Sequence, residues 1–529
     1  MKARRLGVVL SVTLILVGAC AASGLARPLT APHRGAPLSS LEEARMKASD
    51  AATDDSFGTS VAISGDTAVV GAPDKVLGGV DEAGAAYVFT RSGAGWAQRA
   101  ALTVPAADRM ALDRYGTSVA ISGDTILVGC YFKSYDGMEG AGAVYVYTGS
   151  GATWTLQATL NAGTMGAHDQ FGYSVALDGD TAVVGDLYQT VGGKSYSGSA
   201  YVFTRSGGVW TQQQMLSASD AAANDRFGFS VALDGDTALV GADKKTVGAN
   251  AYAGSVYVFT RSGSAWSERT QLAPSDGAAN RHFGDTVALS GDTALVGRYY
   301  GREQSLGGAP DAGAAYVFTG SGASWAQQAE LVSADVVAGD LFGTAVALEG
   351  DRAVVGAPFK ITSGPSGAGA AYVFDRSGTA WSQVARVLAS DQNSYDVFGA
   401  SVSLSGARLL VGAPGKTVGT RGGAGVAYVE LLGAARPAVS LKAAPASLKA
   451  GGLVTLSGAV TPPVAGYKSL VLERKSGSKW VALKTLSVSA SGAYRWKMRT
   501  KKPGKLVLRA RYSVGVSSFP SKQATVNVR

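Results

Sequence analysis

Short apolar runs separated by tight turns recur along most of the chain. In the unit that begins near residue 227, residues 230–233 form one apolar run, Asp234-Gly235 follows, and residues 237–240 form a second run. Asp-Gly between two apolar runs favours a tight β-hairpin, because glycine tolerates the positive φ angle that such turns require. Residues 255–259 predict a third strand, residues 261–263 a second turn, and Trp266 leads a more polar fourth strand. The unit is therefore predicted to be a sheet of four antiparallel strands.

This unit occurs seven times. An aromatic-glycine pair opens each copy, at intervals of 56 to 59 residues: Phe57, Tyr115, Phe171, Phe227, Phe283, Phe342 and Phe398. A repeat with four strands per copy is typical of a β-propeller, in which the sheets surround one axis. The 71 glycines and the low charged fraction of 16% also fit many short strands joined by turns. We predict an all-β chain with a seven-bladed β-propeller over residues 38–436.

The two ends of the repeat region predict how the ring closes. Tryptophan marks the fourth strand in six units, at Trp96, Trp154, Trp210, Trp266, Trp325 and Trp381, whereas the seventh unit stops near Glu430 without one. Residues 48–52, before the first unit, match residues 218–222, which follow a fourth strand. We expect residues 41–47 to supply the missing outer strand of the last blade, which protects the sheet edges.

Residues 57–73 read FGTSVAISGDTAVVGAP, and residues 342–358 and 398–414 repeat the pattern. This resembles the FG-GAP repeat of the integrin α-subunit propeller and of many bacterial surface proteins. The resemblance implies a seven-bladed propeller used mainly for adhesion and ligand binding. Many such units bind Ca²⁺ through an Asp-rich loop between their first two strands. Here that connection shrinks to residues 64–66 and its equivalents, too short for the six to eight oxygen ligands of Ca²⁺. We expect no metal and no cofactor.

After residue 436 the repeat ends and the composition changes. Alternating apolar positions follow, among them Val454, Leu456, Leu470 and Leu472, then Val481 and Leu483. Seven or so short strands in residues 437–529 predict a small immunoglobulin-like (Ig-like) β-sandwich. The segment resembles bacterial Ig-like accessory domains, although it has no cysteine pair.

The charge of this C-terminal segment differs from that of the propeller. From Pro437 onward, 17 Lys and Arg stand against Glu473 alone, whereas residues 38–435 hold 25 basic and 38 acidic residues. The densest basic run is a candidate site for polyanions such as anionic wall polymers or lipid headgroups: Arg495, Lys497, Arg499, Lys501, Lys502 and Lys505. A solvated surface, or contact with the acidic propeller, explains the charge equally well. Nucleic acid is not expected as a partner of an exported protein.

Export is predicted by the N-terminus. Lys2, Arg4 and Arg5 precede an apolar stretch over residues 6–17, so residues 1–19 read as a signal peptide and residues 20–37 as a linker. Residues 17–20 resemble a bacterial lipobox, which makes Cys20 a candidate for lipidation. Ordinary cleavage near residue 21 or 26 is the alternative and leaves a free secreted protein. Cys130 stands where other repeats have a small residue such as Ala72, so a buried, unreactive thiol is expected.

Connections in an antiparallel blade alternate between two rims, and the longer, more variable ones gather on one of them. Function concentrates in variable loops on a rigid scaffold, so this long-loop rim is the candidate surface for an extracellular protein or glycan. Its loops offer Tyr and Arg, which are enriched at binding sites: Tyr131, Phe132, Tyr135, Tyr188, Tyr196, Tyr252, Arg298, Tyr299, Tyr300 and Arg302. Packing between blades is the alternative for each ring.

Aspartates also recur on this rim, at fixed offsets before the aromatic-glycine pair, as at Asp50 and Asp55 or Asp220 and Asp225. Because nearly every blade has them, we expect them to cap turns by accepting backbone N–H bonds rather than to ligate cations.

No metal-ligand spacing, phosphate loop or nucleophile elbow occurs in the sequence, and the three histidines have no convincing catalytic partners. We therefore expect a non-enzymatic adhesion or ligand-binding protein of the cell surface, either an envelope lipoprotein or a secreted one. A polysaccharide hydrolase or lyase on the same rim and a purely structural scaffold are the alternatives.

Overall fold

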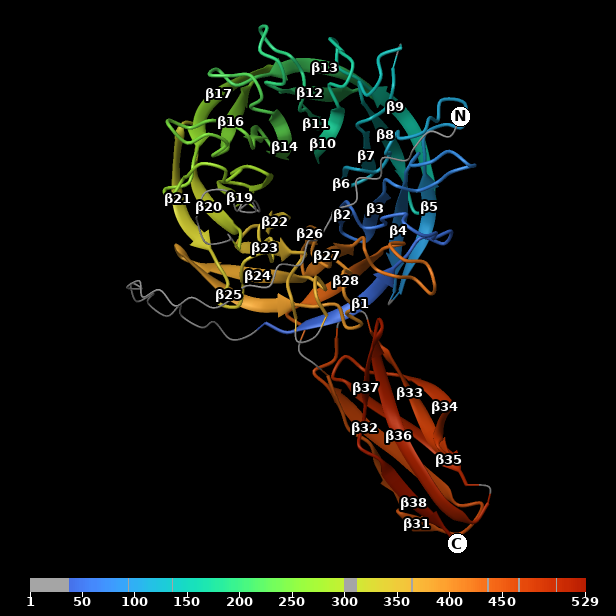
Figure 1. Cartoon of the computed structure of the whole chain (residues 1–529). Coiled ribbons are helices and arrows are strands. Elements are labelled where there is room, and N and C mark those ends of the chain that lie inside the picture. The colour runs from blue at the N-terminus through green and yellow to red at the C-terminus, as the bar shows by residue number, and fades with distance from the viewer. Residues whose placement is uncertain are drawn as a thin grey trace, which may run out of the picture. The chain divides into compact units, whose positions relative to one another are not determined.

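The computed structural model describes residues 38–93, 95–135, 137–298, 312–362, 365–434, 437–464, 467–500 and 502–529. These residues form strands and turns and contain no helix. No helix able to cross a membrane is therefore found among them. The first 28 strands form seven four-stranded sheets around one axis, with the first strand of each sheet innermost and the fourth outermost (Figure 1). The predicted seven-bladed propeller is confirmed.

Each blade follows the strand order expected from the sequence. The first three blades are β2 (Val61–Ser64), β3 (Thr67–Ala72), β4 (Ala85–Ser92) and β5 (Gly95–Leu102); β6 (Val119–Ser122), β7 (Thr125–Cys130), β8 (Ala143–Ser150) and β9 (Thr153–Leu160); β10 (Phe171–Asp178), β11 (Thr181–Asp186), β12 (Ser199–Ser206) and β13 (Val209–Leu216). The next three are β14 (Phe227–Asp234), β15 (Thr237–Ala242), β16 (Ser255–Ser262) and β17 (Ala265–Leu272); β18 (Thr286–Ser290), β19 (Thr293–Arg298), β20 (Ala314–Ser321) and β21 (Ser324–Leu331); β22 (Val346–Glu349), β23 (Arg352–Ala357), β24 (Ala370–Ser377) and β25 (Ala380–Val387).

The seventh blade closes the ring with a strand from the other end of the repeat region. It contains β26 (Ser401–Ser405), β27 (Arg408–Ala413), β28 (Val426–Leu432) and β1 (Ser40–Met46), which pairs antiparallel with β28 from Ser40↔Leu432 to Met46↔Ala427 (Figure 1). A side-chain contact also shows that β1 acts as a fourth strand. Trp210 donates its indole N–H to Gln157 of the preceding outer strand at 2.9 Å, and Trp96 donates in the same way to Glu43 of β1 at 3.3 Å. The predicted closure is confirmed.

The glycines of the repeat lie where neighbouring blades touch. A Cβ on Gly71 would lie 1.9 Å from the carbonyl oxygen of Gly116 in the next blade, and Gly116 itself has a φ of 91°. Any side chain at either position would therefore separate the blades. The Ser60 hydroxyl donates to the same Gly116 carbonyl at 2.7 Å, and equivalent bonds continue around the ring to Ser401 and Gly58 at 2.8 Å. The sixth blade has Ala345 at the serine position.

Of the two recurrent aspartates, the one nearer the aromatic-glycine pair caps a turn, as expected. The expectation is wrong for the earlier one, because Asp50 and Asp220 instead accept the phenol O–H of Tyr87 and Tyr257 at 2.7 and 2.6 Å. Asp225 accepts the backbone N–H of Ala222 at 2.7 Å, and Asp55, Asp113, Asp169, Asp340 and Asp396 accept the N–H three residues earlier in the same way. Five of these six carboxylates also bind a buried lysine that the sequence analysis did not single out. The Nζ–Oδ2 distances are 2.9, 3.3, 2.9, 2.9 and 2.7 Å for Lys75, Lys133, Lys245, Lys360 and Lys416. Each ammonium also donates to the backbone carbonyl of the residue at the Asp50 position, and we call this arrangement the lysine bridge.

Residues from 438 onward form a separate β domain of two sheets. Its strands are β29 (Ala438–Val439), β30 (Lys442–Ala444), β31 (Ser447–Leu448), β32 (Leu453–Thr461), β33 (Ser469–Ser476), β34 (Lys479–Ser487), β35 (Ala493–Arg499), β36 (Gly504–Val514), β37 (Ser517–Pro520) and β38 (Ala524–Val528). The sheets enclose a core that includes Val454, Leu456, Leu470 and Leu472, as the alternation predicts. Val481 is instead 41% exposed, because the pairing of β33 with β34 shifts register after Leu472. The Ig-like assignment remains a prediction.

Candidate functional site: an aromatic patch beside the central channel

A central channel runs along the axis of the propeller. The start of each first strand lines it, leaving a cavity of about 420 Å³. The second residue after each opening aromatic contributes to its wall: Thr59, Thr117, Tyr173, Phe229, Asp285, Thr344 and Ala400. Because a first strand begins where the long fourth-to-first connection ends, these positions lie at the long-loop end of the channel. The large rings of Tyr173 and Phe229 make this wall asymmetric.

Four aromatic rings form a continuous row across the second, third and fourth blades. Ring centroids are 5.8 Å apart for Phe132 and Tyr131, 5.5 Å for Tyr131 and Tyr173, and 5.1 Å for Tyr173 and Phe229. The guanidinium of Arg226 covers the Phe229 ring at 4.6 Å. Burial raises the pKa values of Tyr131 and Tyr173, so both phenols stay neutral. We call these five residues the channel patch.

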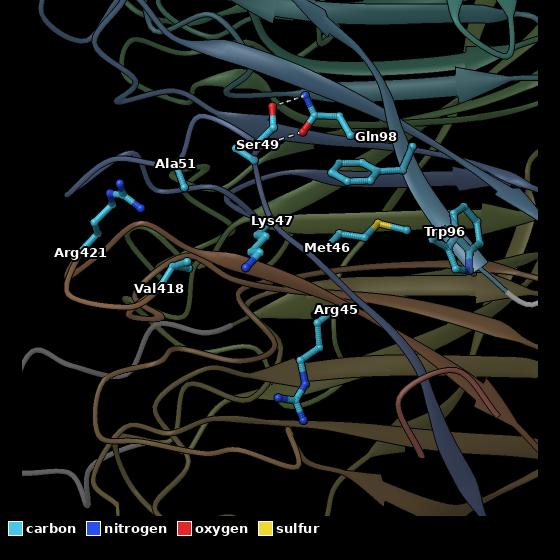
Figure 2. Close-up of a pocket in the computed structure, with 11 residues that line it drawn as sticks. Arg45, Met46, Lys47, Ser49, Ala51, Trp96, Gln98, Val418 and Arg421 are labelled. Atoms are coloured by element: carbon cyan, nitrogen blue, oxygen red, sulfur yellow. Dashed lines mark hydrogen bonds between the residues drawn. The ribbon is translucent and has the colours of Figure 1, made fainter. Parts of the chain in front are cut away.

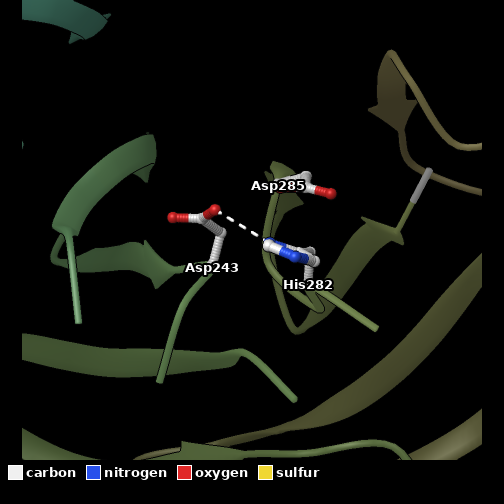
Figure 3. Close-up of side chains that lie close together, drawn as sticks. All are labelled: Asp243, His282 and Asp285. Atoms are coloured by element: carbon white, nitrogen blue, oxygen red, sulfur yellow. Dashed lines mark hydrogen bonds and ion pairs between the residues drawn. The ribbon is translucent and has the colours of Figure 1, made fainter. Parts of the chain in front are cut away.

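A charged group continues the channel patch into the fifth blade. Arg226 binds both carboxylate oxygens of Asp243, with Nε 2.8 Å from Oδ1. Asp243 Oδ2 lies 3.2 Å from Nδ1 of His282, as Figure 3 shows, and His282 stacks against Tyr252 with a centroid separation of 6.3 Å. The side chains of this group are therefore held in fixed positions by one another.

Among the described residues, one group of side chains has the composition of a metal site: Asp243, His282 and Asp285 (Figure 3). One ligand atom from each lies within 4.8 Å of the others. Both oxygens of Asp243 already accept from the Arg226 guanidinium, whose positive charge would repel a cation at the same place. This arrangement fits an ion-pair network better than a metal centre.

The predicted ligand-binding residues fall into three groups. Tyr131 and Phe132 belong to the channel patch, and Tyr188 is half-buried with its centroid 5.4 Å from Tyr196. Tyr135, Tyr196 and Tyr252 are exposed by 37%, 50% and 45%. Arg298 is buried, where it contacts Asp276 at 3.4 Å and covers the Tyr316 ring at 5.4 Å. This location fits packing rather than ligand contact. Tyr299, Tyr300 and Arg302 lie outside the described residues.

Tyr173, Phe229 and Arg226 were not predicted as site residues, although the repeat contains a signal for two of them. Most other blades place a small residue at the position of Tyr173 and Phe229. A large ring at a position that the fold fills with threonine or alanine elsewhere indicates a local role.

A second hollow lies where the last blade meets the first. Its volume is about 310 Å³, and Met46, Trp96 and Gln98 are among the residues that line it. Figure 2 shows two hydrogen bonds between Ser49 and Gln98. The backbone N–H of Ser49 donates to Oε1 of Gln98 at 2.9 Å, and Nε2 of Gln98 donates to the hydroxyl of Ser49 at 3.1 Å. Gly163 donates equivalently to Gln212 at 2.9 Å in the third blade. The contact therefore belongs to the repeat and joins neighbouring blades.

Three residues of the basic run of the C-terminal domain lie on one face of β35. Arg495, Lys497 and Arg499 are exposed, whereas the alternate residue Tyr494 is buried. Lys502 and Lys505 are also exposed, and Lys501 lies outside the described residues. Glu473 is bound by Arg509 at 2.7 Å and Arg511 at 3.0 Å. Although burial opposes it, these two guanidinium groups lower the pKa of Glu473. The one acid of this domain therefore pairs with two arginines that do not belong to the basic run.

Comparison with family models finds seven matches to the FG-GAP repeat, at residues 41–89, 96–147, 154–203, 210–259, 266–318, 325–374 and 381–429. Each match begins in an outer strand and ends in the third strand of the next blade, so the first match starts within β1. A comparison with curated proteins finds no match. Because the seven matches cover well over half of the sequence, the chain belongs to the FG-GAP repeat family.

Proposed function

We propose that the protein is a non-enzymatic adhesion or ligand-binding protein that holds an extracellular glycan or protein at the channel patch. The observation that carries this proposal is the asymmetry of the channel wall. Five blades have Thr, Asp or Ala at the position where the third and fourth have Tyr173 and Phe229. Residues that every blade needs for folding recur in the repeat, whereas a binding site belongs to particular blades.

The chemistry of the patch favours a glycan first. Aromatic faces stack on the apolar faces of sugar rings, and fixed polar groups at the edge bond to hydroxyls. Tyr173 and Phe229 supply the rings, and the Arg226–Asp243 pair supplies a rigid donor and acceptor beside them. Exposed Tyr196 and Tyr252 extend the surface outward.

A hydrolase or lyase needs a carboxyl group with a raised pKa that also reaches its substrate. Burial raises the pKa of Asp186 in the third blade well above its usual range, yet this side chain is 0% exposed. A group without accessible surface does not contact a polysaccharide, so Asp186 does not fit the role of a catalytic acid.

The test replaces residues of the channel wall with the residues that other blades have at the same position. Binding to glycan and matrix-protein arrays is compared for the wild type, the variant Tyr173→Thr/Phe229→Thr, and Thr344→Ala as the matched control. The double variant introduces threonine, which the first blade has at the same position as Thr59, and the control introduces alanine, which the seventh blade has there as Ala400. Both variants therefore use residues that occur at this position in other blades. We expect the double variant to weaken binding about 10- to 100-fold, since each lost aromatic contact costs about 1 kcal/mol or more. Undiminished binding by the double variant, with its folding intact, would refute the site.

The C-terminal domain is proposed to bind a polyanion, such as an anionic wall polymer or lipid headgroup, through the exposed face of β35. The supporting observation is that Arg495, Lys497 and Arg499 share one exposed side of a single strand. Replacing all three with Gln is expected to abolish sedimentation with anionic vesicles or wall polymer in 0.15 M salt. Equal binding by the triple variant, or binding insensitive to salt, would argue against it.

We also propose that the protein is exported. Cys20 is then either lipidated, in an envelope lipoprotein, or removed with the signal peptide, in a secreted protein. Mass spectrometry of the mature N-terminus separates the two forms. A mature chain that still begins at Met1 contradicts export.

A further inference from the structure

The third blade departs from the lysine bridge in three positions at once. Gln189 stands where the fourth blade has Lys245, Asp186 stands where it has Ala242, and Thr164 stands where it has Asp220. The capping carboxylate, Asp169, is retained and accepts the Gly166 N–H. The blade has therefore lost the buried ammonium and gained a second buried carboxyl group.

These groups converge on one point. One terminal atom of the Gln189 amide lies 2.8 Å from Asp186 Oδ2, 3.1 Å from Asp169 Oδ2 and 3.2 Å from the Thr164 carbonyl oxygen. In the fourth blade the ammonium of Lys245 contacts the equivalent atoms, Asp225 Oδ2 at 2.9 Å and the Asp220 carbonyl at 2.6 Å. The end of the Gln189 side chain thus lies where the other blades hold a positive charge.

The uncharged amide does not balance this pocket. Asp186 is 0% exposed, and among the described residues its Oδ1 has no hydrogen-bond partner. An amide has two N–H hydrogens for the three oxygens that face it, so one oxygen stays without a donor, and the amide brings no charge to offset the two acids. Burial raises the pKa values of both acids, and Asp169 adds to the effect on Asp186. Two buried carboxylates with no cation beside them are costly.

We infer that this pocket binds one Ca²⁺ ion, held by Asp169, Asp186, the Thr164 carbonyl and the Gln189 side-chain oxygen. All four ligands are hard oxygens, which Ca²⁺ prefers at about 2.3–2.6 Å. The terminal atom of Gln189 lies 2.8–3.2 Å from one oxygen of each of the other three ligands, a spacing that also suits neighbouring ligands of such an ion when the amide oxygen faces inward. Asp186 Oδ1 is available as a further ligand.

The site lies on the two long connections of the third blade, before β10 and after β11. It is thus separate from the turn between the first and second strands, which is the connection that binds Ca²⁺ in many FG-GAP units and which spans only residues 179–180 in this blade. Tyr188 lies in the same connection between Asp186 and Gln189, and its N–H donates to the Asp169 carbonyl at 3.0 Å. Ion binding therefore fixes the connection that presents Tyr188 and Tyr196 on the rim.

The test measures Ca²⁺ binding to the purified full chain after treatment with EDTA. Equilibrium dialysis with radioactive Ca²⁺ gives the stoichiometry, and thermal unfolding with and without 5 mM Ca²⁺ gives the linked stabilisation. We expect one ion per chain with a Kd below about 1 mM and a Tm raised by a few degrees. The variant Asp186→Ala/Gln189→Lys gives the third blade the lysine bridge of its neighbours. It should bind no Ca²⁺ and show the same Tm in Ca²⁺ and in EDTA.

The control Asp180→Asn removes an exposed carboxylate of the same blade and should bind Ca²⁺ as the wild type does. No binding up to 10 mM Ca²⁺, or equal binding by the lysine-bridge variant, would overturn the inference. A single variant, Asp186→Asn, separates an ion from a proton. If it stabilises the chain at pH 7.5 and the wild type shows no Ca²⁺ effect, a proton neutralises the pocket and the inference is wrong.

Discussion

The lysine bridge of the fourth blade offers a sharp test of what holds each blade together. Lys245 is 5% exposed, and its Nζ lies 2.9 Å from Asp225 Oδ2, 2.6 Å from the Asp220 carbonyl and 3.2 Å from Asp220 Oδ2. The change Lys245→Met keeps the length and apolar stem of the side chain and removes the charge. Within the described part of the chain, the carboxylate of Asp225, which is 3% exposed, then keeps the Ala222 N–H at 2.7 Å as its only hydrogen-bond partner.

The expected loss of unfolding free energy is about 3–5 kcal/mol, the usual cost of removing one partner from a buried ion pair. The double variant Lys245→Met/Asp225→Asn should lose less than the single variant, because no uncompensated charge stays buried. Lys47→Met removes an exposed lysine and should change stability by no more than about 0.5 kcal/mol.

Guanidinium unfolding followed by circular dichroism and tryptophan fluorescence supplies the measurement, with coincident transitions as the condition for comparing free energies. The reasoning is refuted if Lys245→Met lies within about 1 kcal/mol of the wild type. It is also refuted if the double variant is less stable than the single one.

Three further outcomes follow from buried or half-buried groups elsewhere in the propeller. Glu430 lies beside Glu42 across β28 and β1, and burial together with Glu42 raises the pKa of Glu430 to about 8. The folded chain therefore keeps a proton that the unfolded chain releases near pH 4.5, so the free energy of unfolding falls as the pH rises from about 4.5 to 8. Glu430→Gln should flatten this fall in a pH series of thermal unfolding. Cys130 is 0% exposed and burial raises the pKa of its thiol, so a thiol reagent at pH 8 should modify it only in denaturant; rapid reaction of the folded chain contradicts this. Ser401→Ala removes the hydroxyl bond to the Gly58 carbonyl and should cost about 1 kcal/mol in guanidinium unfolding, whereas a loss above about 3 kcal/mol would mean that the bond supports the whole closure.

The sequence predicted the features that every blade shares. Aromatic-glycine pairs, Asp-Gly turns and the missing seventh tryptophan were enough to give seven sheets and the pairing of β1 with β28, because the fold demands these residues at fixed offsets. The capping role of Asp225 and its equivalents followed for the same reason.

The features that could not be predicted depend on contacts between segments far apart in the sequence. Lys245 also recurs at a fixed offset, yet a lysine is usually solvated, and only the structure shows its ammonium enclosed by Asp225 and a carbonyl. Tyr173 and Phe229 lie at strand starts that line the channel rather than in the long loops, so the variability of the loops gives no signal for them. Arg298 looked like a surface group, although it is buried over the ring of Tyr316.

The way β1 is held has a mechanical consequence. Ser40 pairs with Leu432, so the segments before β1 and after β28 leave the strand pair at the same end. Tension between those two segments loads the hydrogen bonds in sequence from that end, as a zipper opens, rather than shearing all of them at once. Tension applied between residues 38 and 434 would therefore open this seam first, while the six blades made of consecutive strands stayed intact.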